Sequence, residues 1–192
     1  MNMEISKKSN DLVVTCDGCI NLDYTLDCGQ SFRWKKEKDV WSAVVCGKKI
    51  KIEQKDENTL IFYDTTEDDF EQIWKVYFDL ERDYDTIISR FSEDEHLKTS
   101  SEAYYGIRVL NQEPWEALCS FIISQNNNIP RIKGIIDRLC ENFGEDLGDG
   151  FFTFPSPEKL STLSPEDLSP LRAGFRAKYI IDAARKISSG EV

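Results

Sequence analysis

The 192 residues are 40% hydrophobic, 11% aromatic and 31% charged, a globular composition that excludes disordered, collagen-like and disulfide-scaffold chains. The formal net charge of -11 argues against a general nucleic-acid coat protein, because like charge repels phosphate. No apolar run reaches the roughly 18 residues that span a bilayer and residues 1–10 lack a secretory apolar segment, so we expect an intracellular protein that is not secreted and has no membrane partner.

The first third of the chain alternates in a strand-like way. Residues 11–16 contain a Leu-Val-Val run, residues 49–53 alternate strictly, and residues 59–63 are β-branched and aromatic. Gly47 lies between two such runs, which predicts a hairpin over residues 41–54. We therefore expect an antiparallel sheet with one face in water.

From residue 65 the apolar period becomes helical. Thr66 followed by Asp69 is an N-cap signal, and two Ser-Pro-Glu sequences, at residues 156–158 and 164–166, predict further helix starts. Apolar stripes at helical spacing predict buried faces. They comprise Phe70, Ile73, Trp74 and Tyr77; Tyr84, Ile87, Ile88 and Phe91; Trp115, Leu118 and Ile122 after Pro114; Ile132, Ile135, Ile136, Leu139 and Phe143 before Gly144; and Ala177, Ile180, Ala184 and Ile187.

A sheet part followed by a helical part is an α+β arrangement. We predict two domains, an antiparallel sheet domain with flanking helices over residues 1–98 and a helical domain over residues 99–192. Charge divides unevenly between them. Residues 51–100 hold fifteen acidic and six basic side chains, whereas between residues 171 and 186 five basic side chains face one acidic side chain. One basic patch on an acidic body can still bind a polyanion if the acidic groups face elsewhere.

Histidine and cysteine usage limits the chemistry. His96 is the single histidine and lies in an acidic stretch, so Ser-His or Cys-His catalysis is disfavoured and an exposed position is expected. Cys16 and Cys19 form a Cys-x-x-Cys without the second pair that a strong zinc motif requires. Cys119 and Cys140 fall in apolar helical patterns and are expected to be buried. We expect free thiols throughout.

Three segments are not explained by packing alone. Residues 29–34, Gly-Gln-Ser-Phe-Arg-Trp, combine a glycine that permits close backbone approach with an arginine between two aromatic side chains. Residues 126–128 are three consecutive asparagines between two helical patterns, of which an N-cap explains only Asn128. Phe175 and Arg176 follow Gly174 in the basic patch, and an exposed aromatic ring beside an arginine at a turn suits insertion into a base stack.

These three segments lie in residues 29–34, 124–131 and 174–179. In order and spacing they resemble the 8-oxoguanine DNA glycosylases of the helix-hairpin-helix superfamily. The similarity covers about residues 11–189. It implies a twisted antiparallel sheet domain followed by a helical helix-hairpin-helix glycosylase domain. Such enzymes flip the damaged base out of the duplex before cutting its glycosidic bond.

The resemblance also implies roles for individual residues. Gly29 would offer its carbonyl to the N7–H that distinguishes oxidised guanine from guanine. Asn126 would enter the space that the flipped base leaves. Arg131 and Arg176 would hold the orphaned cytosine, whose acceptors match a donor-only guanidinium. Phe175 would be the wedge that kinks the duplex, although several family members carry tyrosine there.

The catalytic lysine and aspartate of the family lie in and after a glycine-rich hairpin that has no equivalent in this sequence. We expect them beyond Val192, so this chain would hold the N-terminal portion of a longer enzyme and be inactive alone. Lys178 is a less favoured substitute, because its position better suits a phosphate contact. The resemblance requires no metal and no cofactor.

The sequence thus predicts the recognition half of a bifunctional glycosylase/AP lyase for base excision repair, located in the cytoplasm or nucleoid. Its partner would be double-stranded DNA containing 8-oxoguanine opposite cytosine, and the full-length protein would be a monomer. One alternative is a catalytically silent DNA- or protein-binding module. Another is an alkylpurine DNA glycosylase, which the Gly29-Gln30 pair and the asparagine run disfavour.

Overall fold

The structure is a computed structural model that describes residues 3–16, 18 and 20–192. The chain divides into two compact units. Met1–Gln30, Lys36–Ser42 and Ile50–Asn111 form the first unit, and Ser31–Lys35, Ala43–Lys49 and Gln112–Val192 form the second. These units are groups of residues in mutual contact, and the domain boundary after residue 98 stays a prediction.

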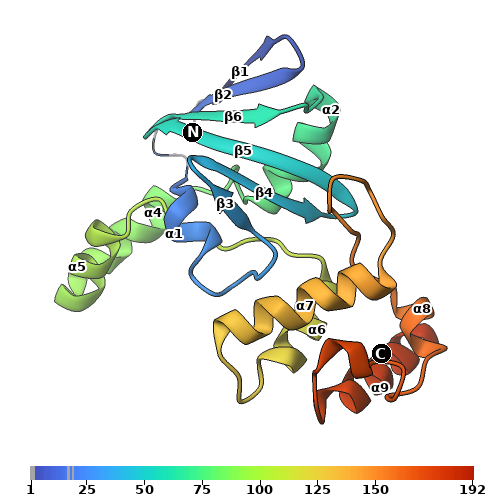
Figure 1. Cartoon of the computed structure of the whole chain (residues 1–192). Coiled ribbons are helices and arrows are strands. Elements are labelled where there is room, and N and C mark those ends of the chain that lie inside the picture. The colour runs from blue at the N-terminus through green and yellow to red at the C-terminus, as the bar shows by residue number, and fades with distance from the viewer. Residues whose placement is uncertain (1–2, 17, 19) are drawn as a thin grey trace. The chain divides into compact units, whose positions relative to one another are not determined.

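A six-stranded sheet confirms the α+β fold. Its strand order is β1-β2-β6-β5-β4-β3 (Figure 1). The strands are β1 (Met3–Lys8), β2 (Asp11–Cys16), β3 (Lys35–Glu37), β4 (Val40–Val45), β5 (Lys48–Asp56) and β6 (Thr59–Tyr63). The pairs β1–β2, β2–β6 and β5–β6 are antiparallel.

The register of the sheet aligns its buried face. Leu12 of β2 and Ile52 of β5 both lie opposite Phe62 of β6, and all three side chains are fully buried. The Phe62 ring meets the rings of Phe70 and Phe78 edge-on, with centroid distances of 5.2 and 6.1 Å. The helical segment after β6 therefore supplies the apolar cover for this face.

The predicted hairpin is confirmed. Cys46 and Gly47 connect β4 to β5 with positive φ values of 49° and 75°, the backbone that a two-residue hairpin loop needs to match strand twist. The first strand, β1, was not predicted, because its side chains are almost all exposed and carry no apolar alternation. It is held by its ladder with β2.

The first unit also carries short helical elements. Thr66 caps the segment after β6, its hydroxyl accepting from the Asp69 N–H at 3.1 Å, as predicted. No side chain of α4, η2 or α5 is buried, so the buried face predicted from the stripe over residues 84–91 is wrong. His96 is exposed as expected. The elements are α1 (Leu22–Leu26), α2 (Glu67–Asp69), the π-helical turn η1 (Phe70–Trp74), α3 (Lys75–Tyr77), α4 (Tyr84–Ser89), the 3-10 turn η2 (Arg90–Glu93) and α5 (Glu95–Ala103).

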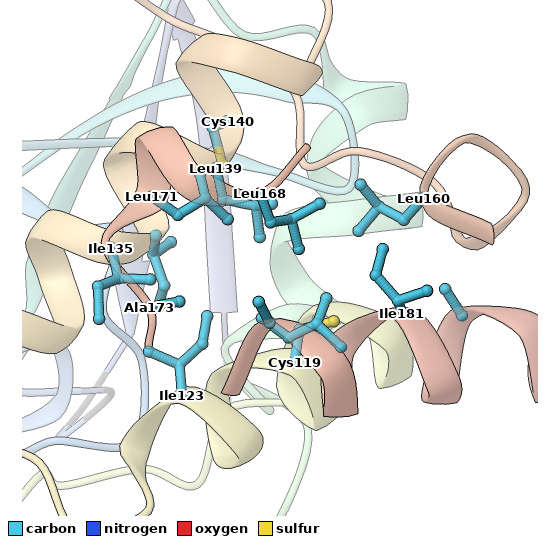
Figure 2. Packing of buried hydrophobic residues seen from close by; sticks show 14 of the residues in the cluster. Cys119, Ile123, Ile135, Leu139, Cys140, Leu160, Leu168, Leu171, Ala173 and Ile181 are labelled. Atoms are coloured by element: carbon cyan, nitrogen blue, oxygen red, sulfur yellow. The ribbon is translucent and has the colours of Figure 1, made fainter. Parts of the chain in front are cut away.

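The second unit packs its helices around one apolar core, shown in Figure 2. Its elements are α6 (Pro114–Ser124), α7 (Ile129–Phe143), α8 (Pro157–Ser161), the 3-10 turn η3 (Ser169–Leu171) and α9 (Arg176–Ser188). The predicted stripes of α7 and α9 are confirmed, since Ile135, Ile136 and Leu139 are fully buried, as are Ile180 and Ala184. Gly144 is the C-cap of α7, and this position requires glycine because a Cβ there would lie 2.0 Å from the Thr153 carbonyl oxygen.

Two predictions for this unit are wrong. Trp115 of α6 is buried as predicted and Ile122 is partly buried, but Leu118 is exposed, and Cys119 and Ile123 complete the buried face in its place. Ser156 caps α8 as predicted, but the second Ser-Pro-Glu starts no α-helix. There the Ser164 N–H donates to the Asp167 carboxylate at 2.9 Å, and only turns and η3 follow.

Among the residues that the structure describes, no helix is long and apolar enough to cross a membrane.

Candidate functional site

The three asparagines between α6 and α7 have three different environments. Asn127 donates from Nδ2 to the Ile123 carbonyl at 3.0 Å and so caps the end of α6. Asn128 accepts the Arg131 N–H at 3.0 Å and caps the start of α7. Asn126 is exposed and has a positive φ of 49°, a conformation that asparagine tolerates better than most side chains. Capping thus explains two of the three, and Asn126 is left at the tip of the turn.

Arg176, at the start of α9, holds this turn in place through hydrogen bonds to its backbone. We call the turn, held in this way, the braced turn. Its side chain is 97% buried (3% exposed). The guanidinium donates to the Gln125 carbonyl through Nε at 3.1 Å and through Nη2, to the Asn126 carbonyl through Nη2 at 2.9 Å, and to the Ala173 carbonyl through Nη1 at 3.3 Å. The bonds to Gln125 and Asn126 satisfy carbonyls that the end of α6 leaves without helical partners, and the bond to Ala173 lies in the loop before α9. They also use most of the five N–H donors of a guanidinium.

Phe175 lies directly before α9 and is 55% exposed. Its ring stands 4.6 Å from the Arg176 guanidinium and meets the Tyr179 ring edge-on at 6.3 Å. The preceding Gly174 has a positive φ of 62°, which glycine adopts without strain. A large apolar side chain held outward by a buried neighbour is suited to contact another molecule.

A groove of about 520 Å³ opens beside Phe175. Its walls come from α6, the following turn and α9, and they are mainly apolar. The lining residues are Leu118, Phe121, Ile122, Gln125, Phe175, Tyr179, Asp182, Ala183, Lys186, Ile187 and Val192.

The basic patch predicted from the sequence is only partly free to bind an anion. Arg176 is buried, and Arg185 donates to the carbonyls of Ser161 and Leu163 at 3.3 and 2.9 Å. Lys186 lies 3.4 Å from the Asp182 carboxylate. Arg172 and Lys178 are exposed, as is Arg131 in the first turn of α7. The structure therefore brings Asn126, Arg131, Phe175 and Arg176 onto the α6–α7 turn and the start of α9.

Gly29 belongs to the first unit, in the loop that follows α1. It is partly exposed and has a positive φ of 89°. A side chain would strain this backbone, so the position favours glycine for its conformation as well as for close approach. Because glycine has no side chain, only backbone atoms of residue 29 are available for contact.

Arg33 of the same sequence segment has a structural place that was not predicted. Its side chain is only 9% exposed. Its Nη1 donates to the Glu116 carboxylate at 3.1 Å, and its Nη2 donates to the Phe152 carbonyl. Burial raises the pKa of Glu116, and the charge of Arg33 opposes that rise. Arg33 therefore acts inside the second unit rather than at its surface.

The described cysteines differ in state, and Cys28 and Cys46 are free and exposed. Cys16 is disulfide-bonded, which corrects the expectation of free thiols at that residue, and Cys19 lies outside the described residues. Cys119 and Cys140 are buried as predicted, and burial raises the pKa of Cys140 to about 12. Within the described residues, no group of three or more His, Cys, Asp or Glu side chains is placed to hold a metal ion.

Two family models match the chain in succession. The model for the 8-oxoguanine DNA glycosylase N-terminal domain matches residues 13–118, and the model for HhH-GPD superfamily base excision DNA repair proteins matches residues 119–190. The chain belongs to the 8-oxoguanine DNA glycosylase family. The resemblance inferred from the three sequence segments is thereby confirmed.

Individual relatives agree with this assignment. The chain is 34% identical over 184 residues to the N-glycosylase/DNA lyase of Saccharomyces cerevisiae, a match that covers 84% of this chain and 48% of the yeast protein. The solved 8-oxoguanine glycosylase/lyase of Clostridium acetobutylicum, in complex with DNA containing cytosine opposite 8-oxoguanine, matches with a TM-score of 0.92 and 36% identity, covering 100% of this chain and 68% of that chain.

A relative from the alkylpurine class also matches. The DNA-3-methyladenine glycosylase of Bacillus subtilis is 30% identical over 121 residues, which cover 60% of this chain and 40% of that protein. The chain spans about half the length, or less, of the curated relatives it matches.

Proposed function

We propose that this chain is the recognition part of a base excision repair glycosylase/AP lyase that flips and excises 8-oxoguanine opposite cytosine. The observation that carries the proposal is the braced turn: an exposed Asn126 amide and an exposed Phe175 ring are held together by one buried arginine. Family membership supplies the reaction class. We further propose that the full-length enzyme works as a monomer inside the cell.

On the DNA side, Phe175 enters the base stack as a wedge and Asn126 fills the space of the flipped nucleotide. Arg131 donates to the acceptors of the orphaned cytosine, since a guanidinium carries donors only. Arg176 is proposed as the second cytosine contact. Because most of its donors already bind carbonyls, its contact with DNA would use its remaining N–H or a rearranged turn.

On the lesion side, the Gly29 carbonyl accepts the N7–H of 8-oxoguanine. Guanine has a lone pair at N7 instead, so the same carbonyl would be left without a donor and would face an acceptor. An unsatisfied buried polar group costs about 1–3 kcal/mol, which suffices to discriminate two bases that differ by few atoms.

For the chemistry, a lysine amine bonds to C1′ of the lesion while the bond from C1′ to the base breaks and the base leaves with a proton. The C1′–O4′ bond of the sugar ring then breaks, O4′ takes a proton, and a Schiff base joins the lysine nitrogen to C1′. This Schiff base permits β-elimination of the 3′ phosphate, which nicks the strand. We propose that this lysine and its assisting aspartate lie beyond residue 192, and that Lys178, which is exposed beside Tyr179, binds phosphate. Neither step requires a metal or a cofactor.

Borohydride trapping tests the proposal. The 192-residue chain and the product of its complete reading frame are each incubated with a duplex containing 8-oxoguanine opposite cytosine, and covalent adducts are resolved by electrophoresis. An adduct only with the complete product supports the proposal, and an adduct with the 192-residue chain moves the nucleophile to Lys178 or another local amine. Binding without any adduct favours a silent recognition module. Excision of methylated purines but not of 8-oxoguanine favours an alkylpurine glycosylase.

A further inference from the structure

The side-chain amide of Gln30 pairs with the backbone on both sides of Val109. Its Nε2 donates to the Arg108 carbonyl at 2.8 Å, and its Oε1 accepts the Leu110 N–H at 3.0 Å. A primary amide carries one acceptor beside its donors, so it binds the two groups as one residue of a neighbouring parallel strand would. We call this pair of bonds the Gln30 bracket.

The bracket joins three segments of the first unit. Nε2 also donates to the Thr25 carbonyl in α1 at 3.1 Å, and it lies 3.4 Å from Cys28 Sγ. Thr25 is itself buried and accepts the Arg108 N–H through its hydroxyl at 3.2 Å. One amide thus ties the loop after α1 both to α1 and to residues 108–110.

Residues 108–110 are also held by contacts that do not involve Gln30. Arg108 is 2% exposed, and its guanidinium stacks 4.1 Å from the Tyr84 ring centroid. It donates to the Arg82 carbonyl at 3.1 Å, while the Tyr84 hydroxyl accepts the Val109 N–H at 2.9 Å. The segment is therefore held on the side away from Gln30 as well.

Gly29 precedes Gln30, so the Gly29 carbonyl belongs to the peptide plane that ends at the Gln30 Cα. Glycine leaves its own dihedral angles nearly free, and the direction of this carbonyl must be fixed from outside the residue. We infer that Gln30 is a positioning residue: through the bracket it aims the Gly29 carbonyl at the N7–H of the lesion and so sets the selectivity for oxidised guanine. This inference rests on the proposed function.

Gln54 offers a matched control, because it makes the same pair of bonds elsewhere in the first unit. Its Nε2 donates to the Ile20 carbonyl at 2.8 Å, and its Oε1 accepts the Leu22 N–H at 2.9 Å. This second bracket holds the start of α1, not the loop that carries Gly29. Removing either amide should cost similar stability, whereas only Gln30 should affect base selectivity.

The test compares Gln30→Ala and Gln30→Met with Gln54→Ala in the protein expressed from its complete reading frame. Gln30→Met keeps the side-chain volume and serves if the alanine variant unfolds. Thermal unfolding measures stability. Selectivity is the ratio of the Kd for a duplex with guanine opposite cytosine to the Kd for the duplex with 8-oxoguanine opposite cytosine. We expect the Gln30 variants to lower this ratio about fivefold or more, while Gln54→Ala lowers Tm and leaves the ratio unchanged.

The outcomes separate the inference from the proposed function. If the unsubstituted protein prefers 8-oxoguanine and the Gln30 variants keep that preference within about twofold, the bracket only stabilises the fold and the inference is overturned. If Gln54→Ala lowers the ratio as much, selectivity follows general stability and the inference is again overturned. If the unsubstituted protein binds both duplexes equally, the proposed role of Gly29 fails first, and the inference falls with it.

Discussion

The guanidinium of Arg176 binds the backbone of Asn126, its Nη2 donating to the Asn126 carbonyl oxygen at 2.9 Å. The two residues lie fifty positions apart in the sequence, yet one side chain fixes the turn that exposes the other. Because Phe175 is the covalent neighbour of Arg176, the same brace holds the wedge and the asparagine in one arrangement. The site is thus preorganised by a buried charge whose hydrogen bonds all go to backbone carbonyls.

Replacement of Arg176 should therefore affect both stability and DNA binding. Arg176→Ala leaves the carbonyls of Gln125 and Asn126 without their donors in a buried place, and we expect the free energy of unfolding to fall by about 2–4 kcal/mol. Urea unfolding measures this. Arg185→Ala is the control on the same helix, since Arg185 also donates to two carbonyls but is exposed. It should cost about 1 kcal/mol or less.

A double-mutant cycle tests whether Arg176 acts on DNA through Asn126. If it does, Arg176→Ala should weaken binding to the 8-oxoguanine duplex in the unsubstituted protein and have little further effect when Asn126→Ala is already present. Additive losses in affinity would indicate instead that Arg176 reaches the cytosine independently.

Asn126 itself allows conformation and contact to be separated. Its φ of 49° suits glycine, so Asn126→Gly should leave the unfolding free energy nearly unchanged, whereas Asn126→Ala should lower it by about 1 kcal/mol. Both substitutions remove the amide. Both should therefore weaken binding to the lesion duplex equally, as measured by fluorescence anisotropy, and unimpaired binding by Asn126→Gly would remove the side chain from the proposed interface.

Phe175 is expected to matter for DNA and not for folding. Stacking on a base is worth about 1–3 kcal/mol, so Phe175→Ala should weaken lesion binding about tenfold and reduce duplex bending measured by energy transfer between end labels. Phe175→Tyr should retain both properties. Since the ring is 55% exposed, the Tm of either variant should change little. Normal bending by Phe175→Ala would show that another side chain is the wedge.

Much of the fold could be predicted from local patterns, because those patterns act within a few residues. The Cys46–Gly47 turn, the Thr66 and Ser156 caps and the buried stripe of α7 all follow from neighbouring residues. The strand β1 could not be predicted, since it depends on pairing with β2 and buries almost none of its side chains.

The sequence predicted which residues form the candidate site, but it did not predict the contacts that hold these residues in place. The resemblance selected Asn126, Phe175 and Arg176, yet no local pattern indicates that Arg176 is buried against carbonyls fifty residues away. The burial of Arg33 could not be predicted for the same reason, because its partner Glu116 lies in a helix far along the chain. Burial of a charge is decided by distant polar groups that need a donor or an acceptor.

The Arg33–Glu116 pair predicts a pH dependence of stability. Burial raises the pKa of Glu116 above its ordinary value of 4.5, so the folded state binds this proton more tightly than the unfolded chain. Its stabilising contribution is full below about pH 4.5 and is lost as pH rises through the folded pKa. The free energy of unfolding of Glu116→Gln, relative to that of the unsubstituted protein, should therefore rise between pH 4 and pH 7. Urea unfolding at each pH measures this difference.

The pKa of Asp167 is shifted in the opposite direction, so its contribution to stability has the opposite pH dependence. Hydrogen bonds from Ser164 lower its pKa, so its contribution is present above the ordinary value of 3.8 and is lost as pH falls. In acid, the free energy of unfolding of Asp167→Asn should therefore approach that of the unsubstituted protein.

For Glu116, the contradicting outcome is a free energy of unfolding that changes with pH in parallel for Glu116→Gln and the unsubstituted protein. Such parallel curves would show that Arg33 cancels the effect of burial.

Thiol reactivity tests the core of the second unit. Cys119 and Cys140 are buried in it, and burial raises the pKa of both thiols, that of Cys140 to about 12. Because the thiolate is the reactive form, neither should be alkylated at pH 8 in the native protein, whereas the exposed Cys28 should react readily. Iodoacetamide labelling followed by peptide mass spectrometry measures each site. Arg176→Ala should speed labelling of Cys119, since α6 ends at the braced turn, and equal labelling of Cys119 with and without Arg176 would mean that the brace does not stabilise this helix.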